Sequence, residues 1–136
     1  MRFIIIVKAN ADTEAGIMAD DALFAEMAAY HEALAHAGAL LDAAGLQPSS
    51  AGWRIRYADG KRSVIDGPFA ETKELVAGYT VIQARSREEA LEWTRRFPAP
   101  MGPGITAEIE VRPLYEVDEL AASRPSAERF RALELR

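Results

Sequence analysis

Two strand–helix–strand patterns on either side of a hairpin constrain the fold of this chain more than any other feature. The first pattern opens with the unbroken apolar run 3–7, which is typical of a central strand covered on both faces. Residues 9–19 are small and polar and predict a loop. A helix is predicted from residue 20 or 21 to about residue 37, because large apolar residues recur there at intervals of four, three and four. Gly38 ends this helix, and residues 39–46 form a weaker strand candidate.

A hairpin is predicted at residues 53–66. Its first strand, 53–57, alternates between apolar and basic side chains, which is the pattern of a strand with one wet face. Asp59 and Gly60 supply the two residues of positive φ that a tight turn needs, so the chain returns along the second strand. Trp53 and Tyr57 share one face, and we interpret them as packing or dimer-interface residues rather than a platform for stacking bases.

The second strand–helix–strand pattern follows the hairpin. A strand is predicted at residues 78–84, and Ser86 with Glu89 forms a capping box that begins a short helix. Three prolines after this helix favour an extended connection. Alternating apolar and polar residues then predict a final strand from Ile105 to Val111.

We expect one domain over residues 1–116, with residues 117–136 as a helical extension in which Ser126 caps a last helix from Ala127. Right-handed crossovers fold the two patterns most simply into a ferredoxin-like βαββαβ sheet, with the hairpin inserted and both helices on one face. The predicted fold class is therefore α+β. The other face of the sheet, which carries Thr106, Glu108, Glu110 and Arg112, needs a cover, and a homodimer that stacks two such faces supplies it.

Composition argues against several partners and sites. The net charge of −5 disfavours a broad electrostatic contact with nucleic acid or with an anionic membrane. Without cysteine the chain has no disulfide, no thiolate metal site and no thiol nucleophile. The apolar run 3–7 is too short for a secretory signal or a membrane span, so we expect a cytoplasmic protein.

The segment that joins the hairpin to the next strand is Asp66-Gly67-Pro68-Phe69-Ala70-Glu71-Thr72-Lys73-Glu74. It combines a turn signal with three carboxylates and a lysine. A polar loop between rigid strands is where proteins often display binding or catalytic groups. We call residues 66–74 the signature segment.

The signature segment resembles that of the DGPF subgroup in the YCII-related family, and the resemblance covers nearly the whole chain. The matching blocks are Glu32-Ala33-Leu34 with Ala37-Gly38, Gly45-Leu46-Gln47-Pro48-Ser49-Ser50, the signature segment with Leu75 and Ala77-Gly78-Tyr79, Glu89-Ala90-Leu91-Glu92-Trp93, and Glu108-Ile109-Glu110-Val111-Arg112-Pro113. The resemblance implies a dimeric α+β barrel built on a ferredoxin-like protomer. Relatives are often encoded beside extracytoplasmic-function sigma factors, which implies a link to transcription.

More distant YCII-type relatives include a dechlorinating enzyme and rely on a histidine–aspartate pair. Their histidine lies early in the first helix, which corresponds to a position near Met27 here. This chain has no histidine at that position. The dechlorinating activity is therefore not transferred to it.

His31 and Asp66 are the candidate catalytic residues. The helical spacing turns His31 toward the sheet or its edge and His36 toward solvent. His31 can act as a general base or acid near neutral pH, and the alternative is a core-edge histidine bonded to a carbonyl or an acid. Asp66 can orient His31 or accept a proton, and it can also bond the amides of its own turn.

Glu71, Lys73 and Tyr79 are the candidate ligand-binding residues. Glu71 and Lys73 can bind a small polar or carboxylate ligand together, or they can form a solvated charge pair. Tyr79 can present its hydroxyl to the same cavity or lie in the core. No cofactor motif is present, and no metal site is predicted because the two histidines lie on opposite helix faces.

Three functions follow from these residues. The first is a dimeric small-molecule-binding or regulatory module whose cavity is lined by His31, Asp66 and the signature segment. The second is an enzyme for acid–base chemistry, such as an elimination or isomerisation, with His31 as base and Asp66 as its partner. The third is a protein-interaction subunit that acts with a sigma factor through the hairpin or the polar tail.

Overall fold

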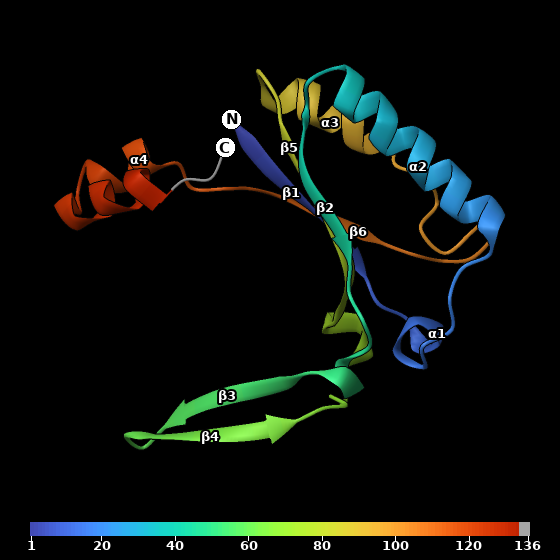
Figure 1. Cartoon of the computed structure of the whole chain (residues 1–136), viewed down its shortest axis with the longest axis horizontal. Helices are drawn as coiled ribbons and strands as arrows, with labels where there is room; N and C mark the ends of the chain where they lie inside the picture. Colours follow the sequence, from blue (N-terminus) through green and yellow to red (C-terminus); the bar gives the residue numbers. More distant parts are fainter. Residues whose placement is uncertain (134–136) are drawn as a thin grey trace.

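A four-stranded antiparallel sheet in the order β2-β5-β1-β6 forms the centre of the computed structural model, which describes residues 1–133 (Figure 1). The strands are β1 (Arg2–Lys8), β2 (Leu40–Gly45), β5 (Val76–Gln83) and β6 (Ile109–Pro113). The first and third strands of the βαββαβ order lie at the centre of the sheet. This arrangement confirms the predicted α+β fold of ferredoxin-like topology.

Two helices, α2 (Asp21–His36) and α3 (Arg87–Arg95), cover one face of the sheet (Figure 1). Each begins at a side-chain oxygen that accepts a backbone N–H. Asp20 accepts from Leu23 at 3.0 Å, and Ser86 accepts from Glu89 at 3.1 Å. Both helix starts agree with the sequence prediction.

The two faces of the sheet differ in burial. Phe3 and Ile5 face the helices and are 5% and 0% exposed, whereas Ile4 and Ile6 on the other face are only half-buried. The core around Phe3 and Ile5 also contains Tyr30, Leu34, Ala39, Ile82, Ala84 and Ala90. We call the face away from α2 and α3, which carries Ile4 and Ile6, the open face.

Charged residues lie beside the apolar ones on the open face. Glu110 lies opposite Ile6 in the register of β1 and β6. Its carboxylate is 3.3 Å from Lys8 Nζ and 3.7 Å from Arg112 Nη1. The sequence prediction placed Glu110 and Arg112 on this uncovered face.

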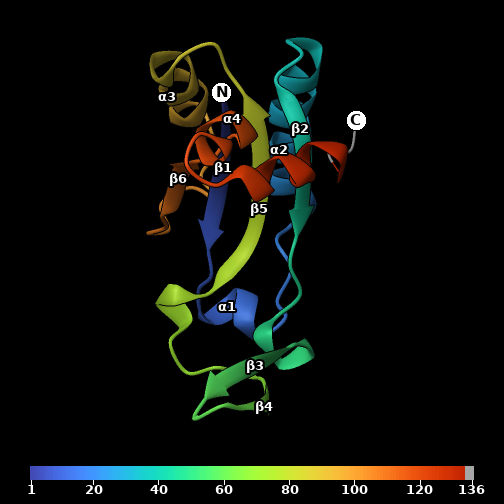
Figure 2. The same ribbon diagram turned by 90° about the vertical axis from the view of Figure 1, so that its left-hand side faces the viewer.

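The inserted hairpin consists of β3 (Trp53–Ala58) and β4 (Lys61–Asp66), which form a separate two-stranded sheet. Asp59 with φ of 52° and Gly60 with φ of 71° make its turn, as predicted. Figures 1 and 2 show that the hairpin projects from the central sheet on the side of the open face. We call residues 53–66 the arm.

The signature segment holds the root of the arm. The Phe69 N–H donates to Ser49 Oγ at 3.0 Å, and the Gly67 N–H donates to the Gly52 carbonyl at 3.0 Å. Ser49, which begins a 3₁₀ turn (Ser49–Ala51), donates its own N–H and its hydroxyl to the Glu14 carboxylate. A second 3₁₀ turn (Thr72–Glu74) leads from the signature segment into β5.

The C-terminal part forms a short helix, α4 (Val117–Ala121), and a 3₁₀ segment (Pro125–Leu133). Both lie on the side of the open face, as Figures 1 and 2 show. The last helix was predicted to begin at Ala127. The structure instead places Ala127, which is 8% exposed, inside the 3₁₀ segment. Residues 134–136 lie outside the described part, and the division into 1–116 and 117–136 stays a prediction.

Two further elements differ from the prediction. A four-residue helix, α1 (Ala11–Glu14), lies in the segment predicted as a loop, because Asn10 and Thr13 each accept the other's backbone N–H at 2.9 Å. β6 begins at Ile109 rather than Ile105, because its pairing with β1 starts only where Ile109 faces Val7. Within residues 1–133, no helix is long and apolar enough to cross a membrane.

Candidate functional site

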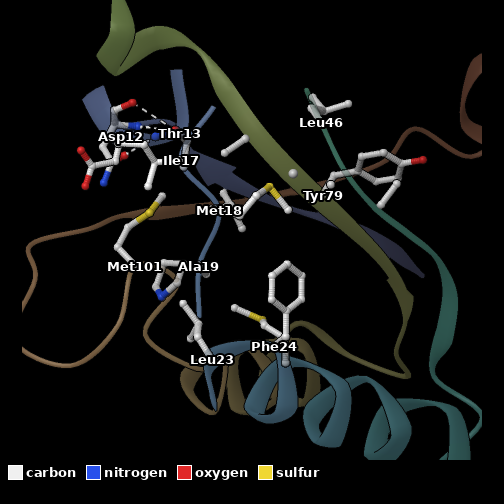
Figure 3. Close-up of a pocket in the computed structure, with 18 of the residues that line it drawn as sticks. Asp12, Thr13, Ile17, Met18, Ala19, Leu23, Phe24, Leu46, Tyr79 and Met101 are labelled. Carbon is white, nitrogen blue, oxygen red and sulfur yellow. Dashed lines mark hydrogen bonds between the residues drawn. The ribbon is translucent and has the colours of Figure 1, made fainter. Parts of the chain in front are cut away.

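A cavity of about 720 Å³ lies between the helix-covered face of the sheet and the first half of α2. Residues of α1 and of the connection after α3 close its sides. Figure 3 shows Leu23 and Phe24 rising from α2 toward the sheet, with Met18 between them and the strands. The apolar part of the wall includes Ile17, Met18, Leu23, Phe24, Met27, Phe97, Met101 and Ile105. Ile105 belongs to the residues that were predicted as strand.

His31 brings a basic nitrogen to this wall. Its Nδ1 is 2.7 Å from the Met27 carbonyl oxygen, and its Nε2 is 2.8 Å from Thr80 Oγ1. Because a carbonyl oxygen can only accept, Nδ1 carries the proton in the neutral ring. Nε2 is then the acceptor, and the Thr80 hydroxyl donates to it. The geometry is that of an imidazole base with a hydroxyl donor.

Aromatic rings fix the orientation of the imidazole. The Tyr30 and Phe97 rings lie edge-on to it, with centroids 5.5 and 6.3 Å from the imidazole centroid. Tyr30 donates its hydroxyl to the Trp93 carbonyl at 2.7 Å, and burial raises the pKa of Tyr30 to about 12. Tyr30 therefore stays neutral beside His31 at physiological pH.

Thr80 was missed by the sequence reasoning. It is 2% exposed and lies on the same face of β5 as Ile82, which is 0% exposed. The alternation of the predicted strand 78–84 places Thr80 on the helix-facing side, so the sequence did indicate that Thr80 is buried there. A hydroxyl has no charge pattern in the sequence, however, and its partner His31 is 49 residues away.

Exposed and partly exposed polar groups of the lining come from α1, from its cap and from Gln47. Asn10 and Thr13 line the cavity, but they already hydrogen-bond each other. Asp12 also lines it and is exposed. Among the lining residues in the described part of the chain there is no lysine or arginine. An anionic ligand would therefore meet the charge of Asp12 without a lysine or arginine to offset it.

Tyr79 lies at the edge of this cavity but directs its hydroxyl elsewhere. It pairs with Ile6 in the register of β5 and β1, and Figure 3 shows its hydroxyl pointing away from Met18 and Phe24. That hydroxyl donates to Asp42 Oδ2 at 2.9 Å. This hydrogen bond, together with the negative charge of Asp42, raises the pKa of Tyr79.

The structure does not bring the other predicted site residues to His31. Asp66 is exposed at the end of β4, opposite Trp53, and does not line the cavity. Glu71 precedes the second 3₁₀ turn and Lys73 lies within it; both are exposed and do not line the cavity. The carbonyl of Met27 occupies the position at Nδ1 that an orienting carboxylate would take. Among residues 1–133, no group of three or more His, Asp or Glu side chains is arranged to hold a metal ion.

Comparison with known proteins assigns the chain to a family. The YCII-related domain matches residues 1–128. The chain belongs to the YCII-related family. This membership confirms the family resemblance that the signature segment and its companion blocks indicated.

Two known proteins resemble this YCII-related protein. An uncharacterised protein of Rhizobium meliloti (strain 1021), R00369, is 37% identical over 103 residues, which are 74% of this chain and 82% of that protein. A solved structure of 5-chloro-2-hydroxyhydroquinone dehydrochlorinase from Burkholderia phenoliruptrix AC1100, in complex with 2,5-dihydroxybenzoquinone, is 15% identical. Its similarity covers 85% of this chain and 95% of that chain, with a TM-score of 0.46.

Proposed function

We propose that this YCII-related protein is a homodimeric small-molecule-binding module whose ligand is a neutral, largely apolar compound with a weakly acidic hydroxyl group. The observation that carries the proposal is the hydrogen bond between His31 Nε2 and Thr80 Oγ1 at the wall of a 720 Å³ cavity. Ligand sites in proteins have volumes of about 300–1,000 Å³ and combine mainly apolar walls with a few polar groups.

The hydrogen-bonding capacity of the cavity selects the ligand. Because Nδ1 of His31 is bonded to the Met27 carbonyl, its Nε2 is free only to accept in the neutral ring. A ligand hydroxyl can donate to Nε2 in place of Thr80, or donate to Thr80 Oγ1 in turn. A carboxylate offers no donor and finds no lysine or arginine in the lining, so we expect it to bind more weakly than a neutral hydroxyl compound.

The homodimer is supported by the open face. Ile4, Ile6 and Val81 lie there and are only half-buried. Stacking two such faces would bury these side chains, at about 25 cal/mol per Å² of apolar surface. Sedimentation equilibrium at micromolar concentration tests this part, and a monomer would contradict it.

Acid–base catalysis is a second candidate function, and the same hydrogen bond favours it. In this function His31 is the base of an elimination or isomerisation and takes the hydroxyl proton of its substrate at Nε2. Asp66, Glu71 and Lys73 would have to reach the site from elsewhere, since they lie outside the cavity of their own chain.

Regulation together with a sigma factor stays an additional proposal. It is based on the family resemblance, and a failed pull-down of the neighbouring sigma factor would argue against it.

A pair of matched ligands tests the binding proposal. 2-Naphthol and 2-naphthoate share one ring system, but the first is neutral at pH 7 and donates a hydroxyl, whereas the second is an anion. Calorimetry should detect 2-naphthol and not 2-naphthoate. A ligand at ~100 times its Kd also stabilises the fold by about 2.7 kcal/mol, which a thermal shift reports. Equal binding of the two ligands, or binding of neither, would contradict the proposal.

The His31→Leu variant separates the specific site from general apolar binding. It keeps an apolar side chain of similar size but removes the acceptor nitrogen. We expect 2-naphthol to bind this variant about tenfold more weakly, because one hydrogen bond to the ligand is lost. Unchanged affinity would show that His31 does not recognise the hydroxyl.

A further inference from the structure

The arm and the mouth of the cavity complement each other in charge and in apolar character, although they do not meet within one chain. We propose that the arm of a second copy closes the cavity mouth. This inference rests on the proposed homodimer and names the part of the partner that completes the ligand site.

The arm is attached beside its own cavity but does not line it. Pro48 and Ala77 line the cavity, whereas residues 49–76 between them do not. The arm leaves this wall and projects toward the side of the open face (Figures 1 and 2). A copy that stacks on the open face therefore lies in the direction of the arm.

One face of the arm is mainly apolar and exposed. The register of β3 and β4 places Trp53, Ile55 and Tyr57 on this face, with Val64 opposite Ile55, Asp66 opposite Trp53 and Arg62 opposite Tyr57. Trp53, Tyr57 and Val64 are 64%, 68% and 66% exposed. A contiguous apolar surface of this kind on a single chain marks an interaction site.

The rim of the cavity is apolar and exposed as well. Ile17 and Met18 precede α2 and are 59% and 73% exposed, and Ile105, in the connection between α3 and β6, is 56% exposed. Phe24 on α2 is 49% exposed. An apolar surface laid across the mouth would cover these side chains together. Each Å² of apolar surface removed from water in this way would stabilise the dimer.

The charges around the two surfaces are opposite. Between residues 9 and 53 the chain contains no lysine or arginine and seven acidic residues, which are Asp12, Glu14, Asp20, Asp21, Glu26, Glu32 and Asp42. The arm carries four basic residues, Arg54, Arg56, Lys61 and Arg62, against two acidic ones, Asp59 and Asp66, so its net charge is +2 in a chain of −5. Of the seven acidic residues only Asp12 lines the cavity, and of the four basic residues only Arg62 lies on the apolar face of the arm. The net charges therefore favour the approach of the arm, while the apolar side chains make the contact.

Symmetry leaves two simple ways to stack the open faces, because the two-fold axis must lie between the sheets. An axis across the strands puts each arm near the start of α3 in its partner, where Arg85 and Arg87 are balanced by Glu88 and Glu89. An axis along the strands puts each arm at the partner's α1 and at the rim of its cavity. The exposed apolar side chains of that rim, which the apolar face of the arm can cover, select the second arrangement.

Cross-linking between two cysteine variants tests this placement without any ligand. The natural chain has no cysteine, so Tyr57→Cys near the tip of the arm in one copy and Met18→Cys in the other introduce the two reactive thiols of a mixed dimer. A short bis-maleimide should join these copies. Glu88→Cys, at the exposed start of α3, replaces Met18→Cys as the matched control and should not be joined. A cross-link to the Glu88→Cys copy instead, or to neither copy, would overturn the proposal.

A mixed dimer also tests the contribution of the arm to binding. One copy carries Trp53→Ala with Tyr57→Ala, which weakens the arm. The other carries Ala43→Trp, which fills the cavity from the exposed edge strand β2, since Ala43 lines the cavity and pairs with Thr80. Both homodimers should bind 2-naphthol about tenfold more weakly than the natural protein. In the mixed dimer, one open cavity faces the intact arm of the other copy. We therefore expect it to bind half as many molecules of 2-naphthol per dimer as the natural protein.

The outcomes separate this inference from the proposed function. If the arm variant binds 2-naphthol as tightly as the natural dimer, the role of the arm is refuted and the binding function stands. If the mixed dimer binds no ligand, each arm serves its own chain, which also overturns the inference. If the natural dimer binds no 2-naphthol, the function proposed above fails, and the cross-link still decides where the arm lies.

Discussion

Gly67 approaches a neighbouring backbone more closely than the other glycines of residues 1–133. A Cβ atom at this position would lie 1.8 Å from the Ser49 carbonyl oxygen and 2.6 Å from its carbon. Ordinary contacts of a Cβ atom begin at 3.4 Å, so a Gly67→Ala variant must separate the two segments by about 1.6 Å, which is 3.4 minus 1.8. Gly67 does not have a positive φ, so the effect is steric and not conformational.

The separation breaks the contacts that hold the root of the arm. The hydrogen bonds from Gly67 N–H to Gly52 and from Phe69 N–H to Ser49 are both 3.0 Å long, and each contributes about 0.5–1.5 kcal/mol. Overpacking that the backbone does not relieve adds about 1–3 kcal/mol. We therefore expect Gly67→Ala to lower the free energy of unfolding by about 2–4 kcal/mol, or Tm by roughly 10 °C.

Gly52→Ala is the matched control for urea denaturation of this variant. A Cβ atom at Gly52 would lie 3.7 Å from the same Ser49 carbonyl oxygen, which is an ordinary contact, and its φ of −114° suits any residue. The free energy of unfolding of the control should lie within about 0.5 kcal/mol of that of the natural chain. Equal midpoints for the two variants would refute the role of Gly67 at the arm root.

Three further predictions follow from the site and its supports. Ser49→Ala removes the hydroxyl that donates to Glu14 and accepts from Phe69, and it should lower the free energy of unfolding in urea by about 1–3 kcal/mol. Ser50→Ala, at the exposed neighbouring position, should change this free energy little. Thr80→Val leaves His31 Nε2 without its donor and should cost about 1–2 kcal/mol, while Thr80→Ser keeps the hydroxyl and should retain most of the stability. Tyr30 has its pKa raised from 10.0 to about 12, so its contribution to stability is full below pH 10 and is lost as the pH rises toward 12. The difference in urea midpoint between pH 9 and pH 11 should therefore be smaller in Tyr30→Phe than in the natural chain.

Local patterns predicted most of the fold. The caps at Asp20 and Ser86 and the turn at Asp59 and Gly60 depend on residues a few positions apart, and the structure agrees with all of them. The sheet order followed from the handedness of crossovers, which holds for nearly all such connections. These features could be predicted because their causes lie within one element or within a general rule.

The elements that were missed have causes outside their own pattern. The four residues of α1 show no apolar period, and the helix exists because Asn10 and Thr13 cap each other. Ile105 alternates with its neighbours as a strand residue does, yet the pairing with β1 reaches only Ile109. An alternating pattern indicates a strand where a partner strand is present, and the sequence pattern does not show where that partner ends.

The partners of His31 in the candidate site also could not be predicted from a local pattern. From the sequence, an acid was the natural partner for His31, because charge is the property that stands out in a list of residues. The structure gives His31 a carbonyl from its own helix and a neutral hydroxyl from β5. Both partners are set by the packing of α2 on the sheet, which positions Nε2 against Thr80. The signature segment, in turn, uses the backbone of Gly67 and Phe69 to hold the arm, and its charged side chains stay outside the cavity. The chemistry of the cavity therefore depends on how a helix and a strand are placed against each other, so the residues to change first are those that the packing brings together.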